Sequence, residues 1–97
     1  MYAVSFDIDT NCLNKHYPQE TYQNAYNDIR KFMENNGFEW QQGSVYFGHI
    51  NKITAVTCVT VVQEMAKSFS WFKACIKDIR MLRIEENNDL MPAIQLV

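Results

Sequence analysis

The chain has 97 residues, of which 47% are hydrophobic and 21% charged, and its formal net charge at pH 7 is −2. This length predicts a single domain over residues 1–97 with one modest hydrophobic core. Three glycines and two prolines exclude collagen-like repeats and low-complexity linkers, and the negative charge excludes a uniformly basic nucleic-acid coat protein.

Residues 2–9 alternate between apolar and polar side chains and predict the first strand. Apolar side chains occupy the even positions from Tyr2 to Ile8, whereas Asp7 and Asp9 occupy odd positions. This strand therefore has one buried face and one face that tolerates carboxylates.

A polar loop over residues 10–17 and then a helix are expected next. Pro18 suits a first helical turn, and Gly37 suits a left-handed cap at the end of the helix. Between them, apolar side chains recur at three- and four-residue steps, which is typical of an amphipathic helix. These side chains are Tyr22, Ala25, Tyr26, Ile29 and Met33.

Two strands, 38–41 and 44–49, are predicted to form a hairpin. Phe38 and Trp40 are apolar at even positions, whereas Val45 and Phe47 are apolar at odd positions, so the register must reset between the pairs. A turn or bulge at residues 42–43 would do this. With Val45 and Phe47 facing the core, Ser44 and Tyr46 are expected to point away from it.

Residues 52–69 are β-branched but do not alternate, and their apolar positions keep helical spacing, so a helix is expected. Trp71 and Phe72 are expected in a short turn before a last strand over residues 76–85. Residues 87–97 are expected to form a tail or a short helix.

The order of elements predicts an α+β, ferredoxin-like βαββαβ fold, with a four-stranded antiparallel sheet and two helices on one face. The other face of the sheet lacks a cover. Two sheets packed face to face would supply one, which predicts a two-fold homodimer. Asp7 would then lie on or near the dimer face.

Cysteine use and targeting signals point to the cytoplasm. Cys12, Cys58 and Cys75 are odd in number and far apart, so three reduced thiols are expected instead of a disulfide scaffold. His16 and His49 lack the spacing of zinc ligands. The N-terminus does not resemble a signal peptide, and the longest apolar run, residues 53–62, is too short to cross a membrane.

The chain resembles the virulence-associated protein D (VapD) family over nearly its whole length. The residues that carry the resemblance are Met1-Tyr-Ala-Val-Ser-Phe-Asp7, Tyr22-Gln-Asn-Ala-Tyr-Asn-Asp-Ile-Arg30, Gly37-Phe-Glu-Trp-Gln-Gln-Gly-Ser-Val-Tyr46, Trp71-Phe72 and Lys77-Asp-Ile-Arg80. The resemblance implies a dimeric, ferredoxin-like endoribonuclease that cuts single-stranded RNA. It also implies a toxin role restrained by a small antitoxin protein.

A more distant resemblance is to the small CRISPR adaptation nuclease-like proteins. It rests on Asp7, on Gln42-Gly-Ser-Val-Tyr46 and on Asp78 with Arg80. In that family the two symmetry-related aspartates of the first strand face each other across the dimer and can hold a divalent metal. The resemblance thus implies that Asp7 is a ligand of Mg²⁺, a cation that prefers oxygen donors.

These observations select candidate site residues. Asp7, Ser44 and Asp78 are the candidate catalytic residues, with Asp7 as a proton acceptor or metal ligand, or alternatively a carboxylate that caps the next loop. Tyr46 would stack an unpaired base or pack in the dimer interface, and Arg80 would contact phosphate. Residues 67–83 hold five basic side chains and one acidic side chain, which provides local positive potential.

The sequence also leaves two other functions open. One is a non-catalytic, ferredoxin-like dimeric adaptor that binds nucleic acid or protein. The other is a ligand-binding regulatory domain of the same topology, which the scarcity of small-molecule motifs disfavours. His16 and His49 are assigned to loop or surface roles, although histidine can act as an acid or base near neutral pH.

Overall fold

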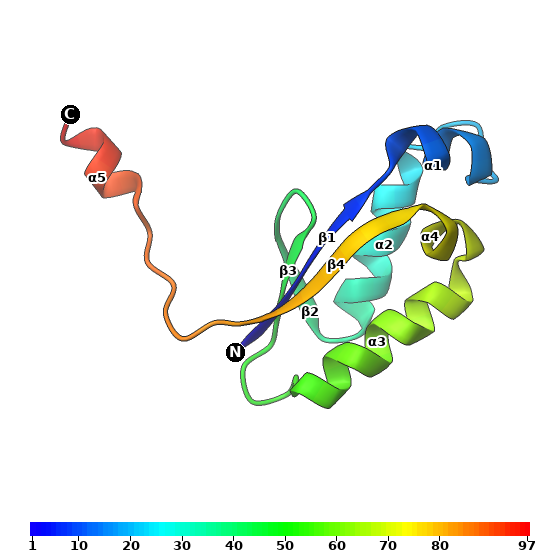
Figure 1. Ribbon diagram of the computed structural model, residues 1–97. Helices are drawn as coiled ribbons and strands as arrows, with labels where there is room; N and C mark the ends of the chain where they lie inside the picture. The colour runs from blue at the N-terminus through cyan, green and yellow to red at the C-terminus, as the bar shows by residue number, and fades with distance from the viewer.

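The computed structural model describes all residues from 1 to 97 and has an α+β architecture (Figure 1). The sheet has four strands in the order β2-β3-β1-β4, and every neighbouring pair is antiparallel. This order is consistent with the predicted ferredoxin-like arrangement. The elements in chain order are β1 (Tyr2–Ile8), α1 (Thr10–His16), α2 (Asn24–Asn35), β2 (Phe38–Gln42), β3 (Val45–Gly48), α3 (Ala55–Ser68), α4 (Ser70–Cys75), β4 (Ile76–Arg83) and α5 (Met91–Gln95).

The core lies between the sheet and the helices on one of its faces. Figure 1 shows α2, α3 and α4 on the same side of the strands. Val4, Phe6 and Ile8 of β1 point into this layer and are buried, as their even positions predicted. They pack with side chains of the helices, including Ile29 and Met65, which are fully buried.

Helices α2 and α3 confirm the sequence prediction. Ala25, Ile29 and Met33 are the buried positions of α2, and Gly37 follows it with a φ of +90°, the left-handed backbone expected of a cap. Helix α3 forms despite its β-branched residues. Its start is stabilised by Thr54, whose side chain accepts a hydrogen bond from the backbone N–H of Thr57 at 3.2 Å.

Two segments are helical where a loop and a turn were expected. Residues 10–16 form α1, because the side chain of Asp9 caps its N-terminus by accepting from the backbone N–H of Cys12 at 3.1 Å. Pro18 therefore follows this helix and does not begin α2, which starts only at Asn24. Trp71 and Phe72 are buried within α4.

The expectation of three reduced thiols is also wrong. Cys12 and Cys75 form a disulfide with their Cα atoms 5.4 Å apart, although 63 residues separate them in sequence. The pair forms because α1 packs against α4, a contact that cysteine spacing does not reveal. Cys58 is free and buried.

The hairpin has a bulge at Gln41 and not at residues 42–43 as predicted, and its second strand faces the other way. The register shifts between Trp40 and Gln42. Tyr46 pairs with Val4 of β1, so it points to the core and is only 3% exposed. Gly48, two residues further along β3, faces the same side. Ile53 packs directly against it, and a Cβ added at Gly48 would lie 2.7 Å from the Ile53 Cβ.

The C-terminal residues leave the body of the molecule. After β4 the chain extends away from the sheet and ends in the short helix α5, as expected for this tail (Figure 1). All residues from 85 to 97 are exposed. No helix of the chain is both long and apolar enough to span a lipid bilayer.

Candidate functional site

Two carboxylates face each other at one end of the sheet. Asp7 of β1 and Asp78 of β4 are direct cross-strand partners, and both point to the face that carries no helices. Their side chains are well exposed, at 67% and 48%. Directly opposed like charges destabilise a sheet, so this pair requires either compensation or a function.

Two cations provide that compensation. The Lys77 Nζ lies 3.9 Å from an Asp7 carboxylate oxygen. The Arg80 Nε donates to both carboxylate oxygens of Asp78, at 3.0 and 3.1 Å. The site thus carries two negative and two positive groups on an open surface.

An irregularity in the β1–β4 pairing places Lys77 at this site. Asp7 pairs with Asp78, but Ile8 pairs with Ile76, so Lys77 is an extra residue in β4. Such bulges redirect side chains and often occur beside active sites. The predicted residues Asp7, Asp78 and Arg80 are therefore brought together, and Lys77 is an addition that the sequence analysis did not single out.

Ser44 and Tyr46 do not share the face of Asp7. The two residues do share a face, but it is the one that the helices cover. Ser44 is nevertheless close in the fold, since its carbonyl accepts a hydrogen bond from the backbone N–H of Phe6 at 3.1 Å, next to Asp7. The sequence analysis expected Ser44 and Tyr46 on the same face as Asp7, and within one chain this is wrong. Tyr46 pairs with Val4, whose side chain points to the helices, so Tyr46 points there too.

Tyr46 is a core residue that also lines a hollow. Its ring stacks on Phe6 with centroids 6.0 Å apart, so neither its ring nor that of Phe6 is a free surface for a base. Burial raises the pKa of Tyr46 to about 12, an effect that the Arg30 charge opposes. The Tyr46 phenol therefore stays protonated at neutral pH.

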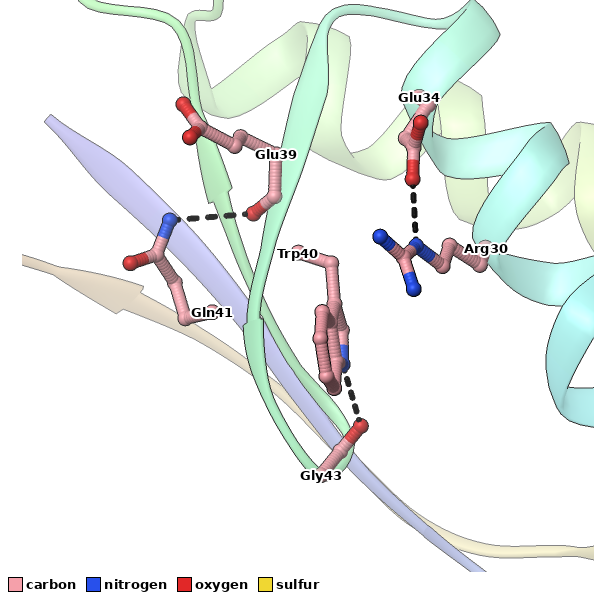
Figure 2. A network of polar contacts seen from close by, with 6 residues as sticks. All are labelled: Arg30, Glu34, Glu39, Trp40, Gln41 and Gly43. Atoms are coloured by element: carbon pink, nitrogen blue, oxygen red, sulfur yellow. Dashed lines mark hydrogen bonds and ion pairs between the residues drawn. The ribbon is translucent and has the colours of Figure 1, made fainter.

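Beside Tyr46, a hollow of about 310 Å³ lies between α2 and the hairpin. Its lining includes Ser44 and three residues that the sequence analysis gave no site role, namely Tyr26, Arg30 and Trp40. Figure 2 shows the Arg30 side chain extending from α2 toward the Trp40 indole. The Arg30 Cζ lies 4.5 Å from the ring centroid of Trp40. One sequence feature could have pointed to this site. The apolar positions change register after Trp40, which indicates that this end of the hairpin is irregular.

The two histidines lie on the surface, as expected. His16 is exposed in the last turn of α1. His49 is exposed just after β3, and its backbone N–H donates to the Gly37 carbonyl at 2.9 Å. Neither makes a side-chain hydrogen bond or ion pair within the chain.

The carboxylates could supply only part of the ligands of a magnesium ion, with water or phosphate oxygens as the others. The chain has no group of three or more residues able to hold a metal ion. Both oxygens of Asp78 are bound by Arg80, whereas Asp7 accepts no hydrogen bond and its one cationic neighbour is the ammonium group of Lys77, at 3.9 Å. Mg²⁺ commonly binds one or two protein carboxylates together with water and phosphate oxygens, so Asp7 is a suitable ligand.

Comparisons with known proteins show the family of the chain. The family model for "CRISPR associated protein Cas2" matches residues 1–91. "Endoribonuclease VapD 2" of Riemerella anatipestifer is 62% identical, over 97% of this chain and 99% of the relative. "Endoribonuclease VapD homolog" of Helicobacter pylori is 62% identical over 100% of this chain and 99% of the relative, and "Endoribonuclease VapD" of Dichelobacter nodosus is 37% identical over 98% of each. The chain therefore belongs to the family described as CRISPR associated protein Cas2 and groups there with the VapD endoribonucleases.

Proposed function

We propose that this chain is an endoribonuclease that cleaves single-stranded RNA at the exposed end of β1 and β4. The observation that carries the proposal is the cross-strand pair Asp7 and Asp78, accompanied by Lys77 and Arg80. A proton acceptor and two cations on one open surface suit the chemistry of a phosphodiester. The names of the relatives support the same activity.

Asp7 is the proposed proton acceptor. It would take the proton of the attacking oxygen, which is either the RNA 2′-hydroxyl or a water molecule, as that oxygen bonds to phosphorus. The bond from phosphorus to the 5′-oxygen of the next nucleotide breaks, and that oxygen takes a proton from solvent water. Mg²⁺, when bound at Asp7, would add stabilisation of the negative charge.

Asp78 and the cations would orient the phosphate. Asp78 holds Arg80 through two hydrogen bonds, which fixes the guanidinium on the open face of the sheet. Arg80 also lies opposite Ser5 of β1, one position along the open face from Asp7. A phosphate that reaches Asp7 would therefore meet Arg80 and Lys77 from the β4 side.

A homodimer through the open face completes this proposal. Ala3 is fully buried between Phe47 and Leu82, its partners on the two neighbouring strands. Leu82 is 47% exposed, and no helix of the chain covers it. Packing two such faces together would bury this apolar strip and bring Asp7 near the same residue of the second chain.

The biological role follows from the resemblance and from the exposed tail. We propose a toxin of a bacterial toxin–antitoxin pair that acts on cytoplasmic RNA. The C-terminal arm exposes Leu90, Met91 and Ile94, and a small antitoxin protein is the proposed partner for this surface.

Cleavage of a labelled single-stranded RNA tests the activity. We expect Asp7→Asn to reduce the rate at least about 100-fold, because a positioned acid or base contributes about that much. Asp9→Asn is the matched control, since it makes the same change two residues away and an asparagine can still cap α1.

Equal rates for the wild type and Asp7→Asn would refute the assigned site. A wild-type protein that binds RNA but leaves it intact, with and without Mg²⁺, would instead support the dimeric adaptor.

A further inference from the structure

The hollow between α2 and the hairpin combines an exposed indole with several free polar groups. Its volume is about 310 Å³, at the lower end for small-molecule sites. It lies on the helix side of the sheet, so it is distinct from the open surface that holds Asp7 and Asp78. The side chains that concern its chemistry are those of Tyr26, Asn27, Arg30, Trp40, Ser44 and Tyr46.

Trp40 is held at the surface by a specific contact. Its indole Nε1 donates to the Gly43 carbonyl at 2.9 Å, which spans the bulge of the hairpin (Figure 2). The side chain is nevertheless 39% exposed, although Trp40 pairs with the buried Tyr46. The protein therefore fixes a large flat ring at the mouth of the hollow without burying it in the core.

Arg30 brings a positive charge to the same ring. Its Nε donates to a Glu34 carboxylate oxygen at 2.7 Å, which holds the guanidinium 4.5 Å from the centroid of the Trp40 ring. The other guanidinium nitrogens make no hydrogen bond within the chain. Arg30 and Trp40 also line a second hollow of about 350 Å³ on the side of Glu34 and His49.

The remaining polar groups of the hollow are free to bind a ligand. The side chains of Tyr26, Asn27, Ser44 and Tyr46 make no hydrogen bond within the chain, yet none of their atoms is buried without a partner. Their donors and acceptors are therefore open to solvent or to a ligand. Burial raises the pKa values of both tyrosines, so their hydroxyl groups are neutral donors at physiological pH.

We propose that this hollow binds one unpaired nucleobase of the RNA, stacked on the indole of Trp40 and hydrogen-bonded by Asn27 and Ser44, with Arg30 contacting the adjoining phosphate. An aromatic platform with a neighbouring cation is the arrangement that single-stranded nucleic acids require. The amide and hydroxyl groups provide donors and acceptors that match the edge of a base.

The position of the hollow relative to Asp7 supports this assignment. Phe6 lines it, and Asp7 is the next residue of β1. Ser44 also lines the hollow, and its carbonyl accepts a hydrogen bond from the backbone N–H of Phe6 at 3.1 Å, next to Asp7. The inference rests on the proposed function, since it takes the bound base to belong to the RNA that is cleaved at Asp7.

Tryptophan fluorescence of the Asp7→Asn protein tests the site without cleavage. The chain has two tryptophans, and Trp71 is only 6% exposed. We expect a short single-stranded RNA to quench the Trp40 emission, whereas ribose 5-phosphate, which lacks a base, leaves it unchanged. Quenching that persists in a Trp40→Phe protein would come from Trp71 and would contradict the proposal.

A matched pair of substitutions separates stacking from simple packing. Trp40→Phe retains an aromatic face, whereas Trp40→Leu retains apolar volume without one. By anisotropy with labelled RNA, we expect Trp40→Leu to weaken binding about 5- to 150-fold and Trp40→Phe to recover most of it. Equal affinities of Trp40→Leu and wild type would overturn the proposal, and circular dichroism would show that both variants are folded.

Kinetics distinguish this proposal from the nuclease proposal. If both are right, Trp40→Leu raises KM for RNA with little change in kcat, whereas Asp7→Asn lowers kcat. If the wild type cleaves RNA and Trp40→Leu has the same KM, the base site is refuted and the nuclease proposal is not. An inactive wild type whose RNA binding depends on Trp40 would refute the nuclease and retain the base site.

Discussion

The two faces of the sheet differ in almost every property, although the same strands form both. On the helix side, Val4 and Phe6 of β1 are buried in the core. On the open side, Ser5 and Asp7 of the same strand meet only their neighbours on β3 and β4. Because strand side chains alternate, one strand supplies the core with one set of residues and the candidate site with the other.

This separation explains how the fold tolerates two opposed carboxylates. Asp7 and Asp78 are exposed on the face opposite the helices, so their repulsion is weakened by water and by Lys77 and Arg80. The base site differs, because Trp40 and Ser44 lie at the margin of the helix-covered face. The following predictions test this contrast through the free energy of unfolding, from the largest expected effect to the smallest.

The largest expected effect comes from neighbouring residues on the two faces. Phe6 stacks on Tyr46 and meets Phe72 edge to face, with both centroid distances 6.0 Å. We expect Phe6→Ala to lower the free energy of unfolding by about 3–5 kcal/mol in urea denaturation. Ser5→Ala, on the open face, should change it by less than about 0.5 kcal/mol. Similar losses for both would show that the two faces are not independent.

The next prediction concerns the disulfide between α1 and α4, which joins the two helices beside the end of the sheet near Asp7. Replacing both Cys12 and Cys75 by serine should lower the free energy of unfolding by about 2–4 kcal/mol, because the bond closes a long loop. The control is the wild type in reductant, which should lose stability to the level of the double variant. A reductant that leaves the wild-type stability unchanged would show that the bond does not form in solution.

A smaller effect is expected where α1 meets α2. The Tyr17 hydroxyl donates to the Asp28 carboxylate at 2.6 Å, and Tyr17→Phe should cost about 1.5 kcal/mol, the lower value for a hydrogen bond to a charged group. Burial, together with this hydrogen bond, raises the pKa of Tyr17 from 10.0 to about 12. The stability linked to this group is therefore complete below pH 10 and is lost as the pH rises through 12.

Unfolding of wild type and Tyr17→Phe between pH 8 and pH 12 measures this linkage. The slope of stability against pH should be shallower in the variant, which keeps the contributions of Tyr26, Tyr46 and Cys58, whose pKa values burial also raises. Parallel slopes would contradict the assignment to Tyr17.

The smallest effect on stability is expected on the open face, with a large effect on assembly. Leu82→Asp should change the unfolding of the monomer by less than about 0.5 kcal/mol but abolish the proposed dimer in light scattering. Met81→Asp is the matched control, because Met81 is similarly exposed, at 45% against 47%, and points to the helix side. A dimer that survives Leu82→Asp would exclude this face as the interface.

The sequence predicted the elements whose signals are local. The alternation of β1 and the helical spacing of α2 and α3 follow from neighbouring residues, and the structure confirms them. The register change after Trp40 was also predicted, although its bulge lies at Gln41 and not at residues 42–43. The sequence analysis also placed Asp78 and Arg80 correctly on one face of a single strand. The predicted face of Tyr46 was wrong. Val45 and Phe47 are apolar enough to be taken for the core positions of β3, and Gly48 has no side chain that would indicate which face is buried.

The sequence by itself determined the order of the four strands and of helices α2 and α3, and the presence of a carboxylate at the end of the first strand, because periods of two and 3.6 residues are local properties. Only the tertiary structure decided which residues meet. The cross-strand pair Asp7 and Asp78 and the disulfide of Cys12 with Cys75 join elements that are distant in sequence. The contact of Arg30 with Trp40 joins the consecutive elements α2 and β2 and depends on how the helix packs beside the hairpin. Strand pairing and helix packing fix these contacts, and no short stretch of sequence contains both partners.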